Sequence, residues 1–188
     1  VRVYQNVTGI WTQIGNDIDG QAANDYFGSS VSISSDGTIV AVGAPYNDTI
    51  GTEAGQVRIY KNISGNWTLL GNVINAESGN DYFGISVSLS SDGSILAVGA
   101  NTNNGNGNNS GHVRVYQKIL EQWVQIGNDI DGEAPNDESG TSIALSADGT
   151  IVAIGADYNN GNGNLSGHVR VFQNISGTWT QIGNDIDG

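Results

Sequence analysis

The sequence VRVYQNVTGIWTQIGNDIDG, residues 1–20, recurs three times along the chain with few changes. The copies start at Val57, Val113 and Val169, so the pattern repeats every 56 residues without an insertion or a deletion. A constant period of this size is typical of proteins in which each unit packs against its neighbours. The repeat predicts a half unit, a hairpin, at 1–20, followed by complete units at 21–76, 77–132 and 133–188, all in one array.

Hydrophobic residues alternate with a period of two within each unit, which predicts strands rather than helices. Four such runs occur in the first complete unit, and we name them A to D in chain order: 27–34, 38–44, 56–62 and 67–73. Asp-Gly and Ser-Gly turns separate A from B and C from D, as in tight hairpins. The sequence therefore predicts an all-β propeller of four-stranded antiparallel blades, with about 3.5 blades in this chain. An open stack of the same sheets is the alternative.

The long polar connections, from B to C and from D to the next A, fall at one end of every predicted sheet. We call this end the loop face. Because loops on a rigid scaffold often carry function, we expect a ligand to bind there. The candidate ligand-binding residues are Asp48, Glu53, Asn103, Asn106, Asp157, Asn159 and Asn162.

Two short motifs mark the strands of the first complete unit. Phe27-Gly28 begins strand A, and Gly43-Ala44-Pro45 ends strand B. With the Asp-Gly turn between them and the VRVY segment after them, they resemble FG-GAP repeats, which occur in the integrin alpha-subunit propeller and in many bacterial surface proteins. The resemblance covers nearly the whole chain, although Asn101 and Asp157 replace the proline in later units. It implies blades in a ring and an extracellular role in adhesion or ligand binding.

Calcium is the cofactor that the resemblance raises, because many FG-GAP repeats carry an Asp-rich calcium loop between the FG and GAP strands. This chain has a single carboxylate there in each unit, at Asp36, Asp92 or Asp148. One carboxylate does not supply the roughly six to eight oxygens that calcium prefers. We therefore expect no cofactor, and the A–B hairpins do not support a calcium site.

An Asp-Ile-Asp sequence recurs after strand D. Two carboxylates spaced by one residue could share a cation, but the same letters fit a turn in which Asp binds nearby amides, and we favour the turn. One unit has Val73 and Asn75 at these positions. The weak metal candidates are Asp17, Asp19, Asp129, Asp131, Asp185 and Asp187.

Four arginines occupy one repeat position, and they are expected to pair with acidic neighbours such as Asp25, Asp81 or Asp137 rather than to bind an anionic ligand. They are Arg2, Arg58, Arg114 and Arg170.

A histidine precedes the Val-Arg of two units. Gln56 stands at the same position as His112 and His168, which favours a polar strand-end residue over a metal ligand or a catalytic base. A tryptophan also recurs in each unit and is expected to pack between sheets rather than to bind sugars. The tryptophans are Trp11, Trp67, Trp123 and Trp179.

The composition excludes several classes of function. Six Lys+Arg against 19 Asp+Glu give a formal net charge of −13, which disfavours binding to nucleic acid. No apolar run is long enough to insert into a membrane. The chain has no cysteine, and no residue interrupts the repeat in the way that a catalytic site usually does. We therefore expect a protein that is not an enzyme.

The first functional hypothesis is an extracellular or cell-surface structural or adhesive protein. Blade-to-blade packing would join it to further copies of the same repeat, in cis or as a homo-oligomer, in a filament or larger array. Glycans or a surface protein are the further partners considered. The alternative is a lectin-like, carbohydrate-binding propeller that uses the loop face.

Overall fold

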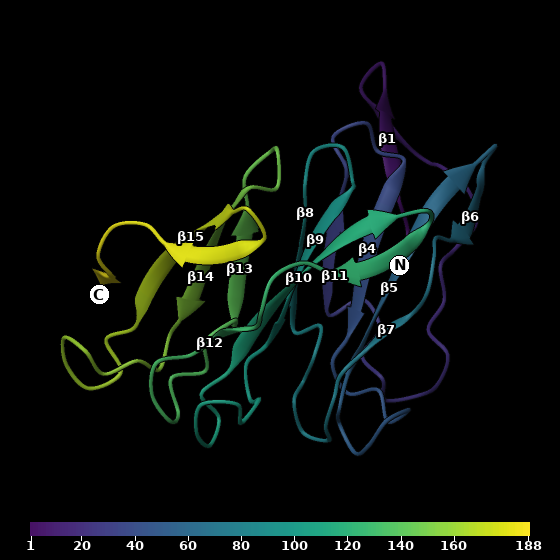
Figure 1. The fold of residues 1–188 in the computed structure, drawn as a ribbon. Coiled ribbons are helices and arrows are strands. Elements are labelled where there is room, and N and C mark those ends of the chain that lie inside the picture. Colours follow the sequence, from purple (N-terminus) through teal and green to yellow (C-terminus); the bar gives the residue numbers. More distant parts are fainter.

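The computed structural model describes all 188 residues, which form strands, turns and loops without a helix (Figure 1). No segment forms a helix that could span a membrane. The first sheet is a hairpin of two antiparallel strands, β1 (Tyr4–Val7) and β2 (Ile10–Gln13). Three larger sheets follow it across the molecule, from the purple N-terminal hairpin to the yellow C-terminal strands.

Each larger sheet is an antiparallel meander of five strands, with the fifth paired to the third. The strands of the first are β3 (Ser30–Ile33), β4 (Ile39–Ala44), β5 (Gln56–Ile63), β6 (Asn66–Leu69) and β7 (Ile74–Asn75). Those of the second are β8 (Ser86–Leu89), β9 (Ile95–Ala100), β10 (His112–Ile119), β11 (Gln122–Gln125) and β12 (Ile130–Asp131). Those of the third are β13 (Ser142–Leu145), β14 (Ile151–Ala156), β15 (His168–Ile175), β16 (Thr178–Gln181) and β17 (Ile186–Asp187).

The predicted strand D, residues 67–73 of the first complete unit, ends early in the structure, and a separate two-residue strand follows it in every larger sheet. In the first, β6 pairs with the far end of β5 and β7 pairs with its beginning, while the chain leaves the ladder between them. Gly71 lies in this interruption with φ +79°, a backbone conformation that glycine adopts without steric cost. The interruption brings the chain under the next sheet, as described below.

The second strand of the first two larger sheets lies at the centre of the core. All six residues of β4 and all six of β9 are buried. Small residues let neighbouring sheets approach closely, because a Cβ added at Gly43 would clash with the carbonyl oxygen of Gly84 in the next sheet. The apolar TIVAVGA run, predicted as strand B, thus forms a central strand between two sheets.

Neighbouring sheets contact each other through the recurring tryptophans. Trp67 Nε1 donates a hydrogen bond to the Ile14 carbonyl at 2.9 Å, and Trp123 Nε1 donates to the Leu70 carbonyl at 3.0 Å. Trp179 makes the equivalent bond to the Ile126 carbonyl at 3.0 Å. The prediction that these tryptophans pack between sheets is confirmed at the three junctions of the chain.

The turns and loops divide between the two ends of the sheets (Figure 1). The long connections, such as those between β4 and β5 and between β9 and β10, gather along the lower edge of the view. The short turns between β8 and β9 and between β13 and β14 lie along the upper edge. The lower edge is the loop face expected from the sequence.

Candidate functional site

Buried amide–carboxylate hydrogen bonds join the long loops of the loop face. Asn47 Nδ2 donates to Asp25 Oδ2 at 2.8 Å, and Asn159 Nδ2 donates to Asp137 Oδ2 at 3.0 Å. Burial raises the pKa of Asp81, although its hydrogen bond from Asn103 opposes that rise. These asparagines and aspartates are all buried, so the expected ligand-binding residues Asn103 and Asn159 lie inside the loop framework.

The other expected ligand-binding residues lie nearer the surface. Asn106 Nδ2 donates to the Gly132 carbonyl at 2.8 Å, and Asn162 Nδ2 donates to the Gly188 carbonyl at 2.8 Å. Both asparagines are exposed, as is Asp157. The structure does not gather the seven predicted residues into one site, because they are distributed over three successive loops.

Three tyrosines form an aromatic cluster on the loop face, which we call the tyrosine cluster. The ring of Tyr46 lies between those of Tyr26 and Tyr82, with centroid distances of 4.7 Å and 5.0 Å. Tyr26 is 65% exposed. Tyr26 and Tyr82 both have φ 53°, which is uncommon for a bulky side chain. The cluster therefore combines an accessible aromatic surface with an unusual backbone.

Two of the expected ligand-binding residues border the tyrosine cluster. Glu53 Oε2 accepts a hydrogen bond from the Tyr82 hydroxyl at 2.8 Å, and this bond raises the pKa of Tyr82 to about 12. Asp48 Oδ1 accepts a hydrogen bond from the Glu53 backbone amide at 2.7 Å. Sequence reasoning missed the tyrosines, although Tyr26 and Tyr82 are 56 residues apart and so occupy one repeat position.

A second cluster of polar residues, the His112 cluster, lies at the start of β10 and consists of Glu77, His112 and Asp129. Arg114 Nη2 donates to Glu77 Oε2 and to Asp129 Oδ2, both at 2.6 Å. The His112 side chain is 1% exposed, and its Nδ1 lies 3.6 Å from Asp129 Oδ2. The single positive charge of Arg114 thus pairs with both carboxylates beside a buried imidazole.

The charges of the His112 cluster shift its pKa values in opposite directions. Burial and the positive charge of Arg114 lower the pKa of His112 to about 4, so the imidazole is neutral at physiological pH. Burial alone would raise the pKa of Asp129, but the hydrogen bonds from Arg114 and Gln125 together with the charge of Arg114 outweigh burial and lower the pKa. Burial also works against the charge of Arg114, but its bonds to Asp129 and Glu77 raise the pKa of the guanidinium.

The equivalent His168 cluster lies at the start of β15 and consists of Glu133, His168 and Asp185. His168 Nδ1 lies 3.9 Å from Glu133 Oε2 and 3.9 Å from Asp185 Oδ2. Arg170 Nη2 donates to the carbonyl oxygen of Asp131 at 2.7 Å, and its Nη1 lies 3.7 Å from Glu133 Oε1. The two histidines are strand-end residues, as the sequence predicted, and each faces two carboxylates.

The predicted acidic partners of the arginines are wrong. Asp25, Asp81 and Asp137 bind asparagines of the loops instead, as described above. Arg2 and Arg114 contact the first aspartate of the Asp-Ile-Asp segment that follows their own strand, and pairing of β12 with β10 places this segment beside Arg114. Arg114 and Arg170 also contact the connection that arrives from the preceding sheet, whereas Arg58 contacts a residue of its own strand. The contacts are Arg2 with Asp17, Arg58 with Gln56, Arg114 with Asp129 and Glu77, and Arg170 with Glu133 and the Asp131 carbonyl.

The two aspartates of each Asp-Ile-Asp segment have different surroundings. The first of each pair accepts a hydrogen bond from a glutamine four residues earlier, as Asp17 does from Gln13 at 2.7 Å. Asp129 and Asp185 do the same and also belong to the histidine clusters. Asp131 and Asp187 lie on the short strands β12 and β17, and burial raises the pKa of Asp131. Asp19 is exposed.

The aspartates of the A–B hairpins hold their own turns. Asp36 Oδ1 accepts hydrogen bonds from Ser34 Oγ at 2.6 Å and from the Thr38 backbone amide at 3.0 Å. These bonds lower the pKa of Asp36. Asp92 and Asp148 repeat the arrangement in the next two sheets.

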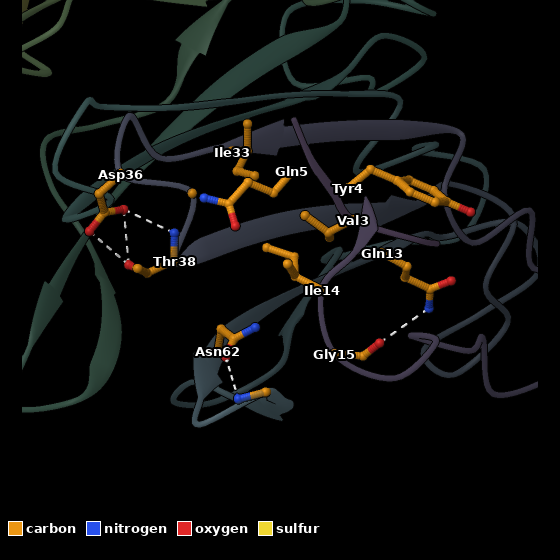
Figure 2. Close-up of a pocket in the computed structure, with 12 residues that line it drawn as sticks. Val3, Tyr4, Gln5, Gln13, Ile14, Gly15, Ile33, Asp36, Thr38 and Asn62 are labelled. Carbon is orange, nitrogen blue, oxygen red and sulfur yellow. Dashed lines mark hydrogen bonds between the residues drawn. The ribbon is translucent and has the colours of Figure 1, made fainter. Parts of the chain in front are cut away.

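The largest cavity is a groove of about 570 Å³ at the opposite end from the loop face, which we call the end groove (Figure 2). It lies between the N-terminal hairpin and the first larger sheet. Figure 2 shows Val3 and Ile14 from the hairpin side and Asp36 and Thr38 from the turn that precedes β4. Gly37 lies at this turn and has no atom within 4 Å of the position of a Cβ.

Residues 18–60 and 75–116 each match the sequence model of the FG-GAP repeat. The chain contains FG-GAP repeats. The second match ends within β10, so both matches hold an A–B hairpin and most of a strand C. Among curated proteins the chain has no significant match.

Solved structures show a similar fold at low sequence identity. A chain of the hydrazine synthase of Kuenenia stuttgartiensis is 13% identical with a TM-score of 0.51, and the match covers 92% of this chain and 41% of that one. The periplasmic gluconolactonase of Pseudomonas aeruginosa is 15% identical with a TM-score of 0.44, covering 100% of this chain and 64% of that one. The chain thus spans less than two thirds of either structure. The all-β, propeller-type class expected from the sequence is confirmed.

Proposed function

We propose that this chain is an extracellular structural or adhesive repeat protein, without catalytic activity, that packs further copies of the same repeat against its two end faces. The copies lie in cis or in neighbouring molecules and extend the array. The supporting observation is that the contacts between sheets recur at constant sequence offsets, while each end of the array leaves complementary halves of these contacts exposed.

The first recurring contact joins a tryptophan to a glycine of the preceding unit. A Cβ added at Gly71 would lie 2.7 Å from the Glu121 carbonyl oxygen and 3.1 Å from Trp123 Cδ1, so only glycine leaves room for the next sheet. At the ends of the array the two halves are free. Trp11 is 68% exposed, and Gly183 has no atom within 4 Å of a Cβ position.

The second recurring contact joins an isoleucine of the second strand to the turn of the next sheet. A Cβ added at Gly93 would lie 2.8 Å from Ile39 Cδ1, and one at Gly149 would lie 2.7 Å from Ile95 Cβ. Gly37 is the equivalent glycine of the first larger sheet, and it borders the end groove. An isoleucine from a further repeat would therefore occupy the end groove.

The N-terminal hairpin gives a further reason for an added repeat. Two-stranded hairpins are marginally stable in water, and three or more strands or a packed face are needed for independent stability. The side chains of Tyr4, Val7, Ile10 and Trp11 on this hairpin are exposed. A further repeat packed against this hairpin would cover these apolar side chains.

Sedimentation velocity with the 188-residue chain tests packing between molecules. We expect concentration-dependent association that Trp11→Asp abolishes, because the aspartate would place a charge in the apolar contact with Gly183 of another molecule. Thr12→Asp is the matched control, because it adds the same charge at a neighbouring position of β2. A monomer at every concentration, or equal association of both variants, would contradict packing between molecules.

Carbohydrate binding at the tyrosine cluster is the second candidate function. Its support is the exposed aromatic surface of Tyr26, flanked by Tyr46, with the Glu53 carboxylate nearby to accept hydrogen bonds from hydroxyl groups. Calorimetric titration with a panel of oligosaccharides would test it. We expect saturable binding that Tyr26→Ala removes and Tyr158→Ala, at the position equivalent to Tyr46 in the third unit, leaves unchanged. No binding by the wild-type chain would exclude this candidate.

A further inference from the structure

We propose that His168, Glu133 and Asp185 form a binding site for a divalent transition-metal ion of the Zn²⁺ type. The three residues come from different parts of the third unit: His168 begins β15, Asp185 precedes β17, and Glu133 lies in the loop between β12 and β13. Their ligand atoms all lie within 4.8 Å of one another. The fold thus brings together an imidazole and two carboxylates, although Glu133 and Asp185 are 52 residues apart in the sequence.

The histidine is buried and has no hydrogen bond. Its side chain is 1% exposed, and Nε2 has no partner. Nδ1 faces the two carboxylates at 3.9 Å, which is beyond hydrogen-bond distance. Buried polar groups in folded proteins are nearly always satisfied by a partner, and a divalent cation held between Nδ1 and the two carboxylates would satisfy this nitrogen.

The ligand atoms and their spacing suit zinc better than calcium. Zn²⁺ binds imidazole nitrogen and carboxylate oxygen, whereas Ca²⁺ prefers oxygen ligands only. A point equidistant from the three atoms lies about 2.5 Å or less from each, so an inward movement of about 0.4 Å per ligand reaches the Zn–N and Zn–O distances. Three protein ligands leave a fourth position for water or for a group from another molecule.

The His112 cluster shows what closes such a site. There Arg114 Nη2 lies 2.6 Å from both carboxylates and takes the place that a metal cation would need. In the His168 cluster Arg170 Nη2 instead binds the Asp131 carbonyl, and the nearest guanidinium nitrogen to Glu133 is 3.7 Å away. Oε2 of Glu133 and Oδ2 of Asp185 accept no hydrogen bond, so both are available to a metal ion.

The three positions also change together within the repeat. The first complete unit has Gln56 at the histidine position, Gln21 at the glutamate position and Val73 at the aspartate position. All three ionisable groups are therefore absent from that unit, and the arginine Arg58 binds Gln56 Oε1 at 2.7 Å instead. The three side chains are thus present or absent together, as expected of groups that share one cation, which is the Arg114 guanidinium in the His112 cluster and the proposed metal ion in the His168 cluster.

Titration calorimetry with ZnCl₂ on the chain freed of any affinity tag tests the site. We expect one equivalent to bind, and we expect His168→Gln to weaken the affinity at least about tenfold, since loss of a ligand exceeds the effect of an outer partner. Glutamine is the residue that another unit already carries at this position, so the variant is compatible with the fold. Glu133→Gln, which copies Gln21, is expected to have the same effect and decides the matter if His168→Gln does not fold.

His112→Gln is the matched control, and it should leave the affinity for zinc unchanged. The d–d absorption of bound Co²⁺ provides a second measurement, since it reports ligand number and geometry directly and should disappear in His168→Gln. The proposal is overturned if the wild-type chain shows no saturable binding. Equal losses in His112→Gln and His168→Gln would overturn it as well, because the ion would then be held by surface carboxylates in general.

Discussion

Replacing Trp123 by alanine should strongly destabilise the chain, whereas the same replacement at Trp11 should not. The Trp123 side chain is 4% exposed, and its Nε1 donates to the Leu70 carbonyl at 3.0 Å. Removing a buried aromatic side chain costs about 3–5 kcal/mol through lost burial and the cavity left behind. The change also leaves the buried Leu70 without this hydrogen bond, so we expect a loss in the upper part of that range.

Trp11→Ala is the internal control, because Trp11 has the same place in its hairpin but is 68% exposed. Exposed substitutions usually change the free energy of unfolding by about 0.5 kcal/mol or less. Urea unfolding followed by far-UV circular dichroism measures both variants at a dilute concentration where the chain is monomeric. The reasoning would be refuted if Trp123→Ala cost less than about 1 kcal/mol, or if the two variants were equally destabilised.

Two further predictions concern the turns. Gly71→Ala and Gly183→Ala share the cost of a positive φ, but only Gly71→Ala places a Cβ 2.7 Å from an atom of the next sheet. In urea unfolding, Gly71→Ala should therefore lower the free energy of unfolding by at least about 1 kcal/mol more than Gly183→Ala. Equal losses would count against the close packing of sheets. Hydrogen bonds from Ser146 and Thr150 lower the pKa of Asp148 to about 2, so the stability it contributes is full above the unfolded-state pKa near 3.9 and is lost as the pH falls toward 2. The melting temperature of the wild type should therefore fall more steeply between about pH 4 and pH 2 than that of Asp148→Asn, and parallel curves would contradict the role of this carboxylate.

The fold could be predicted from the sequence because each local pattern occurs several times along the chain. Alternation and the Asp-Gly turn define strands that the structure contains, and the uninterrupted apolar run becomes the buried strand β4. The early end of strand D was not evident, since it depends on Gly71 adopting a positive φ beneath Trp123 of the next unit. That contact spans 52 residues and has no local signature.

The candidate sites were harder to predict, because they depend on which side chains meet across loops. Arg114 and Asp129 are 15 residues apart and pair because β12 returns beside the start of β10. The sequence had suggested Asp25, Asp81 or Asp137 as partners of the arginines, but Asp137, for example, accepts a hydrogen bond from the Asn159 amide. The sequence did not reveal that each histidine lies beside two carboxylates for the same reason, because these residues are far apart along the chain.

The central claim is that each end face is half of an interface already present inside the chain. Its most direct test is a crystal structure of an extended chain in which a copy of residues 133–168 precedes Val1. These residues precede Val169 in the natural order, so the copy continues the repeat. We predict that the added hairpin completes the first sheet and that the copied Ile151 side chain fills the end groove against Gly37. An added hairpin that lies elsewhere or is disordered, with the groove at Gly37 still open, would contradict the claim.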